Sequence, residues 1–356
     1  MAGLGGLLGT LLAAGAVCLT SGCSAIGYYA QAAGGHMDIL RRARPVAEVV
    51  ADPATAPALR ERLQLSQRMR DFAVSELKLP DNKSYRRYAD LEREAVVWNV
   101  VAAPELSLSL KTWCFPIMGC VGYRGYFDQK AADALALELQ TQGFETSTYG
   151  VPAYSTLGWS NWLGGDPLLN TFLNWPEIEL ARLVFHELAH QVAYAADDTT
   201  FNESFATAVE RIGGRRWLAL HGNDEQRRRA ETVERRRADF RALTQRYRAE
   251  LQALYAGPGD EAGRRAGKAR LMESLRAEYR TLKEGPWMGF KGYDGWFERA
   301  NNASFGVLAA YNELVPQFER LFEAQGGDFE RFYATARELA ALPKDQRRAR
   351  LAGNAP

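Results

Sequence analysis

The stretch Arg182-Leu183-Val184-Phe185-His186-Glu187-Leu188-Ala189-His190-Gln191 decides how the rest of this 356-residue chain is interpreted. It contains the pattern H-E-x-x-H, which is typical of zinc peptidases. Neighbouring residues on a helix are about 100° apart, so His186 and His190 would project from one face, one turn apart. Two neutral imidazoles at that spacing can bind one tetrahedral Zn²⁺. Glu187 would lie beside that face, where a carboxylate can accept a proton from the attacking water.

The residues around the pattern predict a buried helix. Pro176 suits a first helical position, and no glycine or proline occurs from residue 178 to residue 195. Apolar side chains surround the axis of this helix, as is typical of a helix buried on all sides. They belong to Ile178, Leu180, Leu183, Val184, Phe185, Leu188, Val192 and Tyr194. Buried histidines and a buried glutamate need partners. They could be core histidines bonded to backbone carbonyls, but the complete pattern favours a metal site.

A third metal ligand is expected from the segment that follows. Residues 200–210 predict a second helix, with Glu203 in its first turn. Glu203 would complete a His₂Glu zinc site, in which the fourth position is left to water. The alternative is local, because Thr200-x-x-Glu203 has the form of a capping box, in which Glu203 would bond back to the N-cap amide. We favour the ligand role.

Length and composition are those of a globular protein. The chain has 44 Lys and Arg against 43 Asp and Glu, and 47% of its residues are hydrophobic. The balanced charge does not select nucleic acid or acidic lipid as a partner. The length permits one large domain, or one domain with an appendage.

The N-terminus predicts an exported protein. Residues 4–19 form an apolar run that is too short and too rich in glycine for a transmembrane helix. The run ends in Leu19-Thr20-Ser21-Gly22-Cys23-Ser24, which resembles the lipobox of bacterial lipoproteins. That resemblance implies cleavage after residue 22, a lipid on Cys23, and a place in the bacterial cell envelope, facing the periplasm. In a Gram-negative host, the same resemblance implies the outer membrane, because Ser24 rather than Asp follows the cysteine. An ordinary secretory signal is the alternative, since no Lys or Arg precedes Arg41 and Thr20 stands where the lipobox prefers Leu.

Two further cysteines agree with export. Cys114 and Cys120 flank Pro116 and Gly119, which mark a turn. In an oxidising periplasm we expect a short-loop disulfide between them. Two reduced structural thiols are the alternative.

Secondary-structure patterns predict a helix-rich α+β domain with a small mixed sheet. The expected helices are residues 37–50, 56–77, 129–141, 302–314 and a helical tail, and the expected strands are residues 95–101, 123–127 and 144–151. The segment just before the helix that bears His186 and His190 is the candidate edge strand for binding a peptide backbone. Its residues are Tyr154, Ser155, Thr156, Leu157 and Gly158. A surface loop or a core strand is the alternative.

Residues 223–284 predict an antiparallel helical hairpin. Val233, Phe240, Tyr247 and Leu254 recur every seven residues, the stripe of a helix that packs along another. A turn at residues 257–259 separates this helix from a second one. Arginine runs in the first helix are interleaved with acids, which favours a solvated face over nucleic-acid binding. Contact with anionic lipid or a protein partner stays open.

Several stretches of the chain together resemble a known family. They are residues 84–85, 96–100, 113–116, 119–120, 123–127, 153–159, 185–191 and 198–206. They are similar to a bacterial family of putative aminopeptidases, which groups with the gluzincins, the thermolysin and aminopeptidase N kind of metallopeptidase. In gluzincins a second helix bearing Asn-Glu-x-x-Ala supplies the glutamate ligand, and Asn202-Glu203-Ser204-Phe205-Ala206 matches that motif. The connection from His190 to Glu203 is shorter than is usual in gluzincins.

The resemblance implies a zincin-like fold and a donor to the developing oxyanion downstream of the ligands. Tyr311 is the first candidate donor, because residues 301–313 resemble the C-terminal block of the family; Tyr293 and His221 are the others. Asp198 could orient a ligand histidine, or it could cap the second helix. The expected organisation is a signal peptide (1–22), an N-terminal helical segment (23–90), a zincin-like core (91–221), the hairpin (222–285) and a C-terminal helical part (286–356).

The sequence therefore predicts a zinc-dependent peptidase, an aminopeptidase by its resemblance. Its partners would be a peptide or protein substrate and, through the lipid anchor, a membrane; nucleic acid is not expected. One rival is a zinc endopeptidase, because no cluster of acids that grips a free α-amine can be assigned. The other is a non-catalytic scaffold of the envelope, against which Glu187 argues, since a structural zinc site needs no base.

Overall fold

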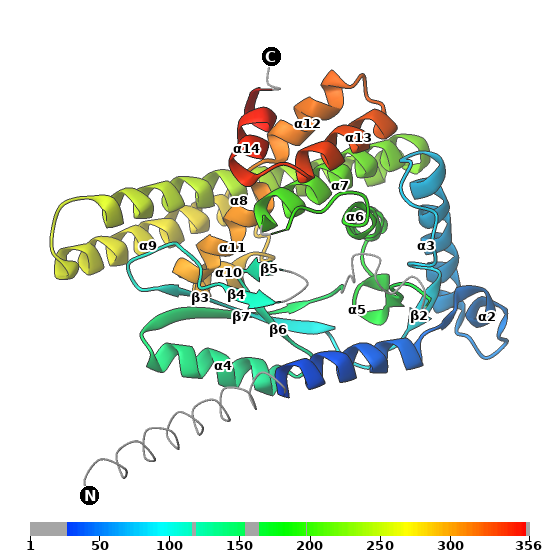
Figure 1. Cartoon of the computed structure of the whole chain (residues 1–356), viewed down its shortest axis with the longest axis horizontal. Coiled ribbons are helices and arrows are strands. Elements are labelled where there is room, and N and C mark those ends of the chain that lie inside the picture. Colours follow the sequence, from blue (N-terminus) through cyan, green and yellow to red (C-terminus); the bar gives the residue numbers. More distant parts are fainter. Residues whose placement is uncertain (1–26, 116–118, 154–163, 197, 354–356) are drawn as a thin grey trace, which may run out of the picture.

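Helices dominate the architecture, as expected for the helix-rich α+β domain predicted from the sequence (Figure 1). The computed structural model describes residues 27–115, 119–153, 164–196 and 198–353. Within these ranges, residues 119 and 309–312 are described by their backbone alone. Residues 27–42 are helical. The elements that follow are β1 (Arg44–Pro45), α2 (Val46–Ala51), α3 (Pro57–Ser75), β2 (Arg87–Ala89), β3 (Val97–Pro104), β4 (Trp113–Phe115), β5 (Gly119–Val121), β6 (Arg124–Tyr126), α4 (Gln129–Thr141), β7 (Phe144–Val151), β8 (Leu168–Leu169), α5 (Asn170–Leu173), α6 (Glu177–Ala189), α7 (Thr199–His221), α8 (Asp224–Ala256), α9 (Glu261–Glu284), α10 (Asp294–Arg299), α11 (Asn302–Asn312), α12 (Val315–Ala324), α13 (Phe329–Ala340) and α14 (Lys344–Gly353).

The strands form three small sheets within the described residues, rather than the single mixed sheet expected from sequence. The main sheet has the order β6-β3-β7 and is antiparallel throughout. The mixed sheet is the short one, β1-β2-β8, and β4 pairs with β5 alone. The single helix predicted over residues 37–50 is two helices in the structure. They are separated by β1, because Arg44 and Pro45 pair with β2.

The central strand β3 is covered on both faces, which explains why its residues form a continuous apolar run. Val100 and Ala102 pack against Ala132, Ala136 and Leu139 of α4. Val101 and Ala103 face the other way and pack against Ala303 of α11. Figure 1 accordingly shows α4 below the sheet and α11 above it. The predicted bounds of α4 and β7 are confirmed.

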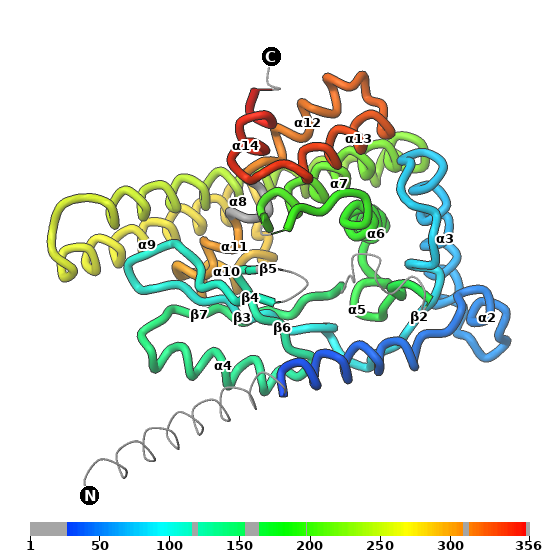
Figure 2. Tube along the Cα trace, in the orientation of Figure 1, coloured from blue at the N-terminus to red at the C-terminus, as the bar shows by residue number. Residues whose placement is uncertain are grey.

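Helix α6 lies at the centre of the largest apolar cluster, as its sequence predicts. Its neighbours include α3 and α7, with the C-terminal helices α12 to α14 beyond α7 (Figure 2). Leu180, Val184, Phe185 and Leu188 are fully buried in this cluster. The helix ends at Ala189, earlier than its apolar pattern indicates. The chain then turns towards α7, and this turn is fixed by Asn202, whose side-chain amide bonds both the N–H (2.8 Å) and the C=O (2.9 Å) of Ala195.

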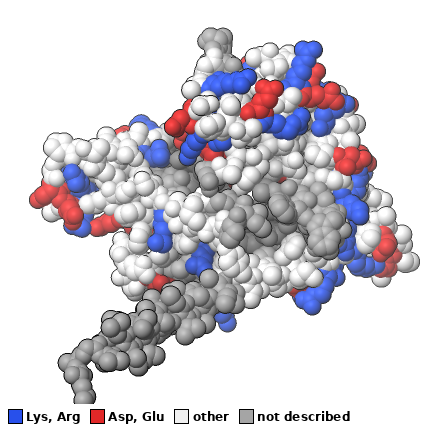
Figure 3. Space-filling view, in the orientation of Figure 1, with Lys and Arg blue, Asp and Glu red and all other residues white. Residues whose placement is uncertain are grey.

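Helices α8 and α9 form the expected antiparallel hairpin, which extends to the left in Figure 1. Asn223 and Gln226 form a capping box at the start of α8. Phe240 and Tyr247 of the predicted stripe lie in a second apolar cluster with residues of α9, α10 and α11. Basic and acidic side chains are interspersed on the face shown in Figure 3, in keeping with the balanced charge of the sequence. Among the described residues no helix is both long enough and apolar enough to cross a bilayer.

Two loops cross beside α6, and a glycine makes the crossing possible. Gly165 has a φ of +72°, and a Cβ placed there would lie 2.4 Å from the backbone nitrogen of Ser84. The Tyr85 N–H donates to the C=O of Asp166 (2.6 Å), and the Asp166 N–H donates to Oγ of Ser84 (3.3 Å). Close contact of the two backbones therefore requires a residue without a side chain at position 165.

Replacing Gly165 by alanine should destabilise the protein much more than the same change at Gly143. Gly143 also has a positive φ, +84°, but a Cβ placed there would have no atom within 4 Å. The left-handed backbone alone should cost about 1–2 kcal/mol at each site, and the backbone displacement at Gly165 should add about 1–3 kcal/mol. Denaturant unfolding of both variants measures the difference. Equal losses would contradict the packing described for the two loops.

Candidate metal centre and active site

Three side chains from two helices converge on one point. The distance from Nε2 of His186 to Nε2 of His190 is 3.2 Å, and Oε2 of Glu203 lies 3.4 Å from the first nitrogen and 3.7 Å from the second. His190 is the residue after the last turn of α6, but its helical φ and ψ (−58° and −22°) preserve the one-turn spacing from His186. Glu203 comes from the first turns of α7. These three residues are a potential metal-binding group.

The triangle formed by these atoms has the size that a tetrahedral zinc site requires. Zn–N and Zn–O bonds of about 2.0–2.1 Å at tetrahedral angles separate the donor atoms by about 3.3–3.4 Å. The three observed separations lie around that value. Both histidines are buried, at 9% and 8% exposed, so water does not substitute fully for a partner. The arrangement of His186, His190 and Glu203 therefore fits Zn²⁺.

Glu203 does not take part in a capping box. The N-cap of α7 is Asp198, whose carboxylate accepts a hydrogen bond from the N–H of Phe201. Thr200 already lies inside the helix, so the capping pair proposed from Thr200-x-x-Glu203 does not form. The Glu203 side chain instead faces the two histidines.

Asp198 has the capping role rather than the expected role of orienting a ligand histidine. Its buried carboxylate also pairs with Arg347 (2.6 Å) and Arg348 (2.7 Å) of α14. These hydrogen bonds hold the pKa of Asp198 below its ordinary value, although burial of the carboxyl opposes the shift. Asp198 thus fastens the C-terminal helix to the start of α7, and its described contacts do not include the ligand histidines.

Glu210 holds the side chain of His186 on α6, a role that was not expected from the sequence. Its Oε2 lies 3.1 Å from Nδ1 of His186, and its Oε1 accepts from Nε of Arg182 at 2.9 Å. A proton on Nδ1 leaves Nε2 of His186 free to face the metal position, the arrangement that carboxylate partners impose on ligand histidines. The available sequence signal is spacing: Glu210 follows Glu203 by two helical turns, and Arg182 precedes His186 by one.

The ion-pair network continues from the metal helix to the hairpin. Arg182 pairs with Glu234 of α8, which also pairs with Arg237 at 3.2 Å. Arg237 returns to α6 through Glu179 at 2.5 Å. Arg182 is nearly buried and Glu234 is partly exposed, and the ion pairs between these groups link α6, α7 and α8 around His186.

Burial and charge set the protonation of the site. Burial opposes ionisation of Glu210, but the hydrogen bond from His186 and the charge of Arg182 outweigh it and lower its pKa to about 2. Burial likewise opposes protonation of His186, yet its hydrogen bonds with Glu203 and Glu210 raise its pKa well above the ordinary value. Burial lowers the pKa of His190 to about 4, so this imidazole is neutral and able to bind a metal at neutral pH.

Glu187 has the properties of a general base. Its side chain is partly accessible, but the surrounding protein still desolvates the carboxylate, and this desolvation raises its pKa to about 7. The charge of His186 opposes the shift, while that of Glu203 reinforces it. A base with a pKa near the working pH is best suited to accept a proton and pass it on.

Two of the three downstream candidates for an oxyanion donor, His221 and Tyr293, pack elsewhere in the described structure. His221 packs against Trp217 at the other end of α7, eighteen residues after Glu203, a separation of about 27 Å along the helix. Tyr293 stacks on Phe240 in the hairpin cluster, with ring centroids 4.3 Å apart. Tyr311 lies in α11, and its side chain is outside the described part of the structure.

Other tyrosines do surround the metal position. Tyr123 and Tyr149 approach from the sheet, and the charge of Glu203 acts on both. Burial is the main cause of their raised pKa values, about 12 for Tyr149, whose hydroxyl is hydrogen-bonded to Asn99. Burial, and after it the charge of Glu187, raises the pKa of the buried Tyr85.

Three sequence predictions fall in other parts of the chain. The candidate substrate strand Tyr154 to Gly158 and the lipidation site Cys23 lie outside the described residues. Cys114 and Cys120 face each other across β4 and β5 and are joined by a disulfide bond, with their Cα atoms 3.9 Å apart.

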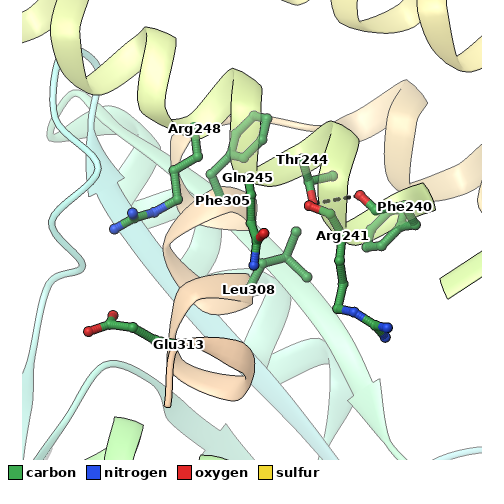
Figure 4. Close-up of a pocket in the computed structure, with 8 residues that line it drawn as sticks. All are labelled: Phe240, Arg241, Thr244, Gln245, Arg248, Phe305, Leu308 and Glu313. Atoms are coloured by element: carbon green, nitrogen blue, oxygen red, sulfur yellow. Dashed lines mark hydrogen bonds between the residues drawn. The ribbon is translucent and has the colours of Figure 1, made fainter. Parts of the chain in front are cut away.

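A surface cavity between α8 and α11 is separate from the metal group (Figure 4). Phe240, Phe305 and Leu308 give it an apolar floor, and Arg241 and Arg248 border it from α8. In Figure 4 the two guanidinium groups point to opposite sides of the cavity, with Glu313 below Arg248. His186, His190 and Glu203 do not line it.

Comparison with known proteins gives a family. The profile of the family described as putative aminopeptidase matches residues 27–351. The match spans almost the whole chain, so the chain belongs to this family. No curated protein and no solved structure matches it.

Substitution of Glu210 should weaken zinc binding, whereas substitution of Asp198 should not. Glu210→Gln removes the charge that holds His186 and should reduce zinc affinity about 10- to 100-fold. Asp198→Asn breaks a buried ion pair that does not include the ligand histidines, and it should cost about 3 kcal/mol of unfolding free energy without changing zinc affinity. Competition with a chromophoric chelator measures the affinity, and denaturant unfolding the stability. The roles given to the two carboxylates are wrong if the effects are reversed.

Zinc affinity should fall steeply as the pH decreases. The raised pKa of His186 means that the metal-free protein holds a proton there at neutral pH. Zinc must displace this proton, so below the folded pKa the apparent affinity should drop about tenfold per pH unit from His186 alone. Calorimetric titrations at pH 7 in two buffers of different ionisation enthalpy should show proton release on binding. Binding without proton release would contradict this protonation state.

Proposed function

We propose that this member of the putative aminopeptidase family is a zinc-dependent peptidase. The observation that carries the proposal is the triangle of donor atoms from His186, His190 and Glu203, whose sides of 3.2, 3.4 and 3.7 Å suit tetrahedral zinc. Glu187, a carboxylate with a pKa of about 7, stands next to it. When bound, Zn²⁺ supplies Lewis-acid chemistry, acidifying water and polarising the scissile carbonyl. A zincin-like arrangement of the catalytic part belongs to the same proposal.

Different residues of this chain would have different roles in hydrolysis. Glu187 accepts the proton of the attacking water and transfers it to the nitrogen of the leaving amine as the C–N bond breaks. Glu210 holds the Nδ1–H of His186, and Arg182 keeps Glu210 ionised. Burial around Glu187 strengthens each of these interactions, because charges act more strongly where water is excluded.

Among peptidases we place this chain with the aminopeptidases, on the strength of its family. The zinc endopeptidase of the cell envelope is the competing function, and its substrates would need no free α-amine. The non-catalytic scaffold is disfavoured by Glu187, because a structural zinc site gains nothing from a carboxylate poised as a base.

We also propose that the protein works outside the cytoplasm. The segment that ends at Cys23 resembles a lipoprotein signal, which would anchor the mature chain to the bacterial membrane, facing the periplasm, with the outer membrane indicated by Ser24. The disulfide between Cys114 and Cys120 supports export, because such bonds form and persist in oxidising compartments.

Glu187→Gln should abolish hydrolysis while zinc stays bound. Glutamine keeps the shape of the side chain but cannot accept the water proton, so kcat should fall by about 10²–10⁴-fold. The assay uses a library of free and N-acetylated peptides, with and without a chelator, and zinc content is measured for each variant. Glu138→Gln, an exposed glutamate on α4, is the matched control and should behave as wild type.

The same library separates the competing functions. Chelator-sensitive release of N-terminal residues only from free peptides supports the aminopeptidase. Internal cleavage of acetylated peptides would identify an endopeptidase, and no chelator-sensitive cleavage at all would favour the scaffold.

A further inference from the structure

Tyr85 has a backbone conformation that tyrosine rarely adopts. Its φ is +63°, in the left-handed region, which is unfavourable for a residue with a Cβ. The conformation is held on both sides: the Tyr85 N–H donates to the C=O of Asp166 (2.6 Å), and its own C=O accepts from Nε2 of Gln67 (2.9 Å). Strain of this kind persists only where the surroundings enforce it.

The segment bearing Tyr85 is fastened directly to the metal helix region. Gln191, the residue after His190, accepts from Nδ2 of Asn82 (2.7 Å) and donates to Oγ of Ser84 (3.2 Å). On the other side, the fully buried Arg70 donates to the C=O of Ser84 (3.0 Å). Tyr85 therefore has a fixed position relative to the histidines of the metal group.

The hydroxyl of Tyr85 is buried and unused. The residue is 2% exposed, and its Oη has no hydrogen-bond partner among the described residues. Leaving a buried hydroxyl unpaired is unfavourable, so a ligand that accepts a hydrogen bond from it would recover that cost. After burial itself, the charge of Glu187 is the largest influence that raises the pKa of Tyr85, so the hydroxyl stays protonated beside the proposed base without bonding to it.

Four other described side chains that could serve as donors are less suited. The Tyr149 hydroxyl is already bonded to Asn99, and burial followed by the charge of Glu203, not of Glu187, raises the pKa of Tyr123. His221 and Tyr293 pack against aromatic rings elsewhere.

We propose that the Tyr85 hydroxyl donates a hydrogen bond to the carbonyl oxygen of the scissile peptide bond as that oxygen becomes negatively charged. In this step the water oxygen bonds to the carbonyl carbon, the C=O π electrons move to the oxygen, and the water proton passes to Glu187. Tyr85 keeps its own proton throughout. When the tetrahedral centre collapses, the C–N bond breaks and the leaving nitrogen takes the proton from Glu187. The inference rests on the proposed peptidase function, and it gives to a residue upstream of the metal helix the role that was expected downstream of it.

Tyr85→Phe tests the inference without disturbing the fold. Removal of one oxyanion donor should lower kcat about 10²–10³-fold, with KM nearly unchanged. Zinc content should stay at the wild-type level, and thermal stability should not fall, because the lost hydroxyl has no partner among the described residues. Tyr88→Phe, a buried tyrosine on the neighbouring β2, is the matched control and should keep wild-type kcat.

A tetrahedral inhibitor supplies a readout that a structural role would not move. A phosphinic peptide carries its negative charge where the oxyanion forms, so its affinity for Tyr85→Phe should fall by the same factor as kcat/KM. Full activity of Tyr85→Phe, a loss explained by lower zinc content, or unchanged inhibitor affinity would each overturn the inference while the peptidase function stands. A wild-type protein without chelator-sensitive hydrolysis would instead remove the proposed function on which the inference depends.

Discussion

The burial of two imidazoles and a carboxylate inside an apolar core is the constraint on which the rest of this structure depends. His186, His190 and Glu203 lie where α6 and α7 pack within the largest apolar cluster. Their donor atoms face one another, so the folded state needs a cation or a proton between them. The low pKa of Glu210 and the raised pKa of His186 show how a proton meets this need in the metal-free protein. Zn²⁺ would meet it more completely, with three ligand bonds instead of one shared proton.

Neighbouring elements are arranged to hold that cluster. The network from Glu210 through Arg182 to Glu234 joins α6 and α7 to the hairpin. Ion pairs as well as apolar packing therefore hold the hairpin against the rest of the protein. Asp198 fastens α14 to the start of the ligand helix. The loop of Tyr85 is clamped between Gln191 and Arg70, and Gly165 lets the opposing loop approach it. Each connection limits the movement of one side of the site, as precise placement of catalytic groups requires.

The sequence predicted the features that follow from local periodicity. The buried helix α6, the helix α4, the strand β7, the hairpin and the α+β class are present as expected, because apolar spacing and turn residues determine them. The pairing of short strands into three sheets and the early end of α6 depend on contacts between distant segments, and local patterns do not encode them. Glu210 and Tyr85 were missed for the same reason. Their importance arises from what lies opposite them in space: an imidazole for Glu210 and the proposed base for Tyr85.

The metal content of the purified protein tests the central claim most directly. Full-length chain isolated without chelator, or refilled with zinc after chelator treatment, should contain one zinc per chain by elemental mass spectrometry. Ala in place of His186 and His190 should abolish this binding, since the remaining carboxylate cannot hold the ion alone. A folded wild-type protein that binds no stoichiometric zinc under either condition would contradict the account, because the donor triangle would then have no metal to explain it.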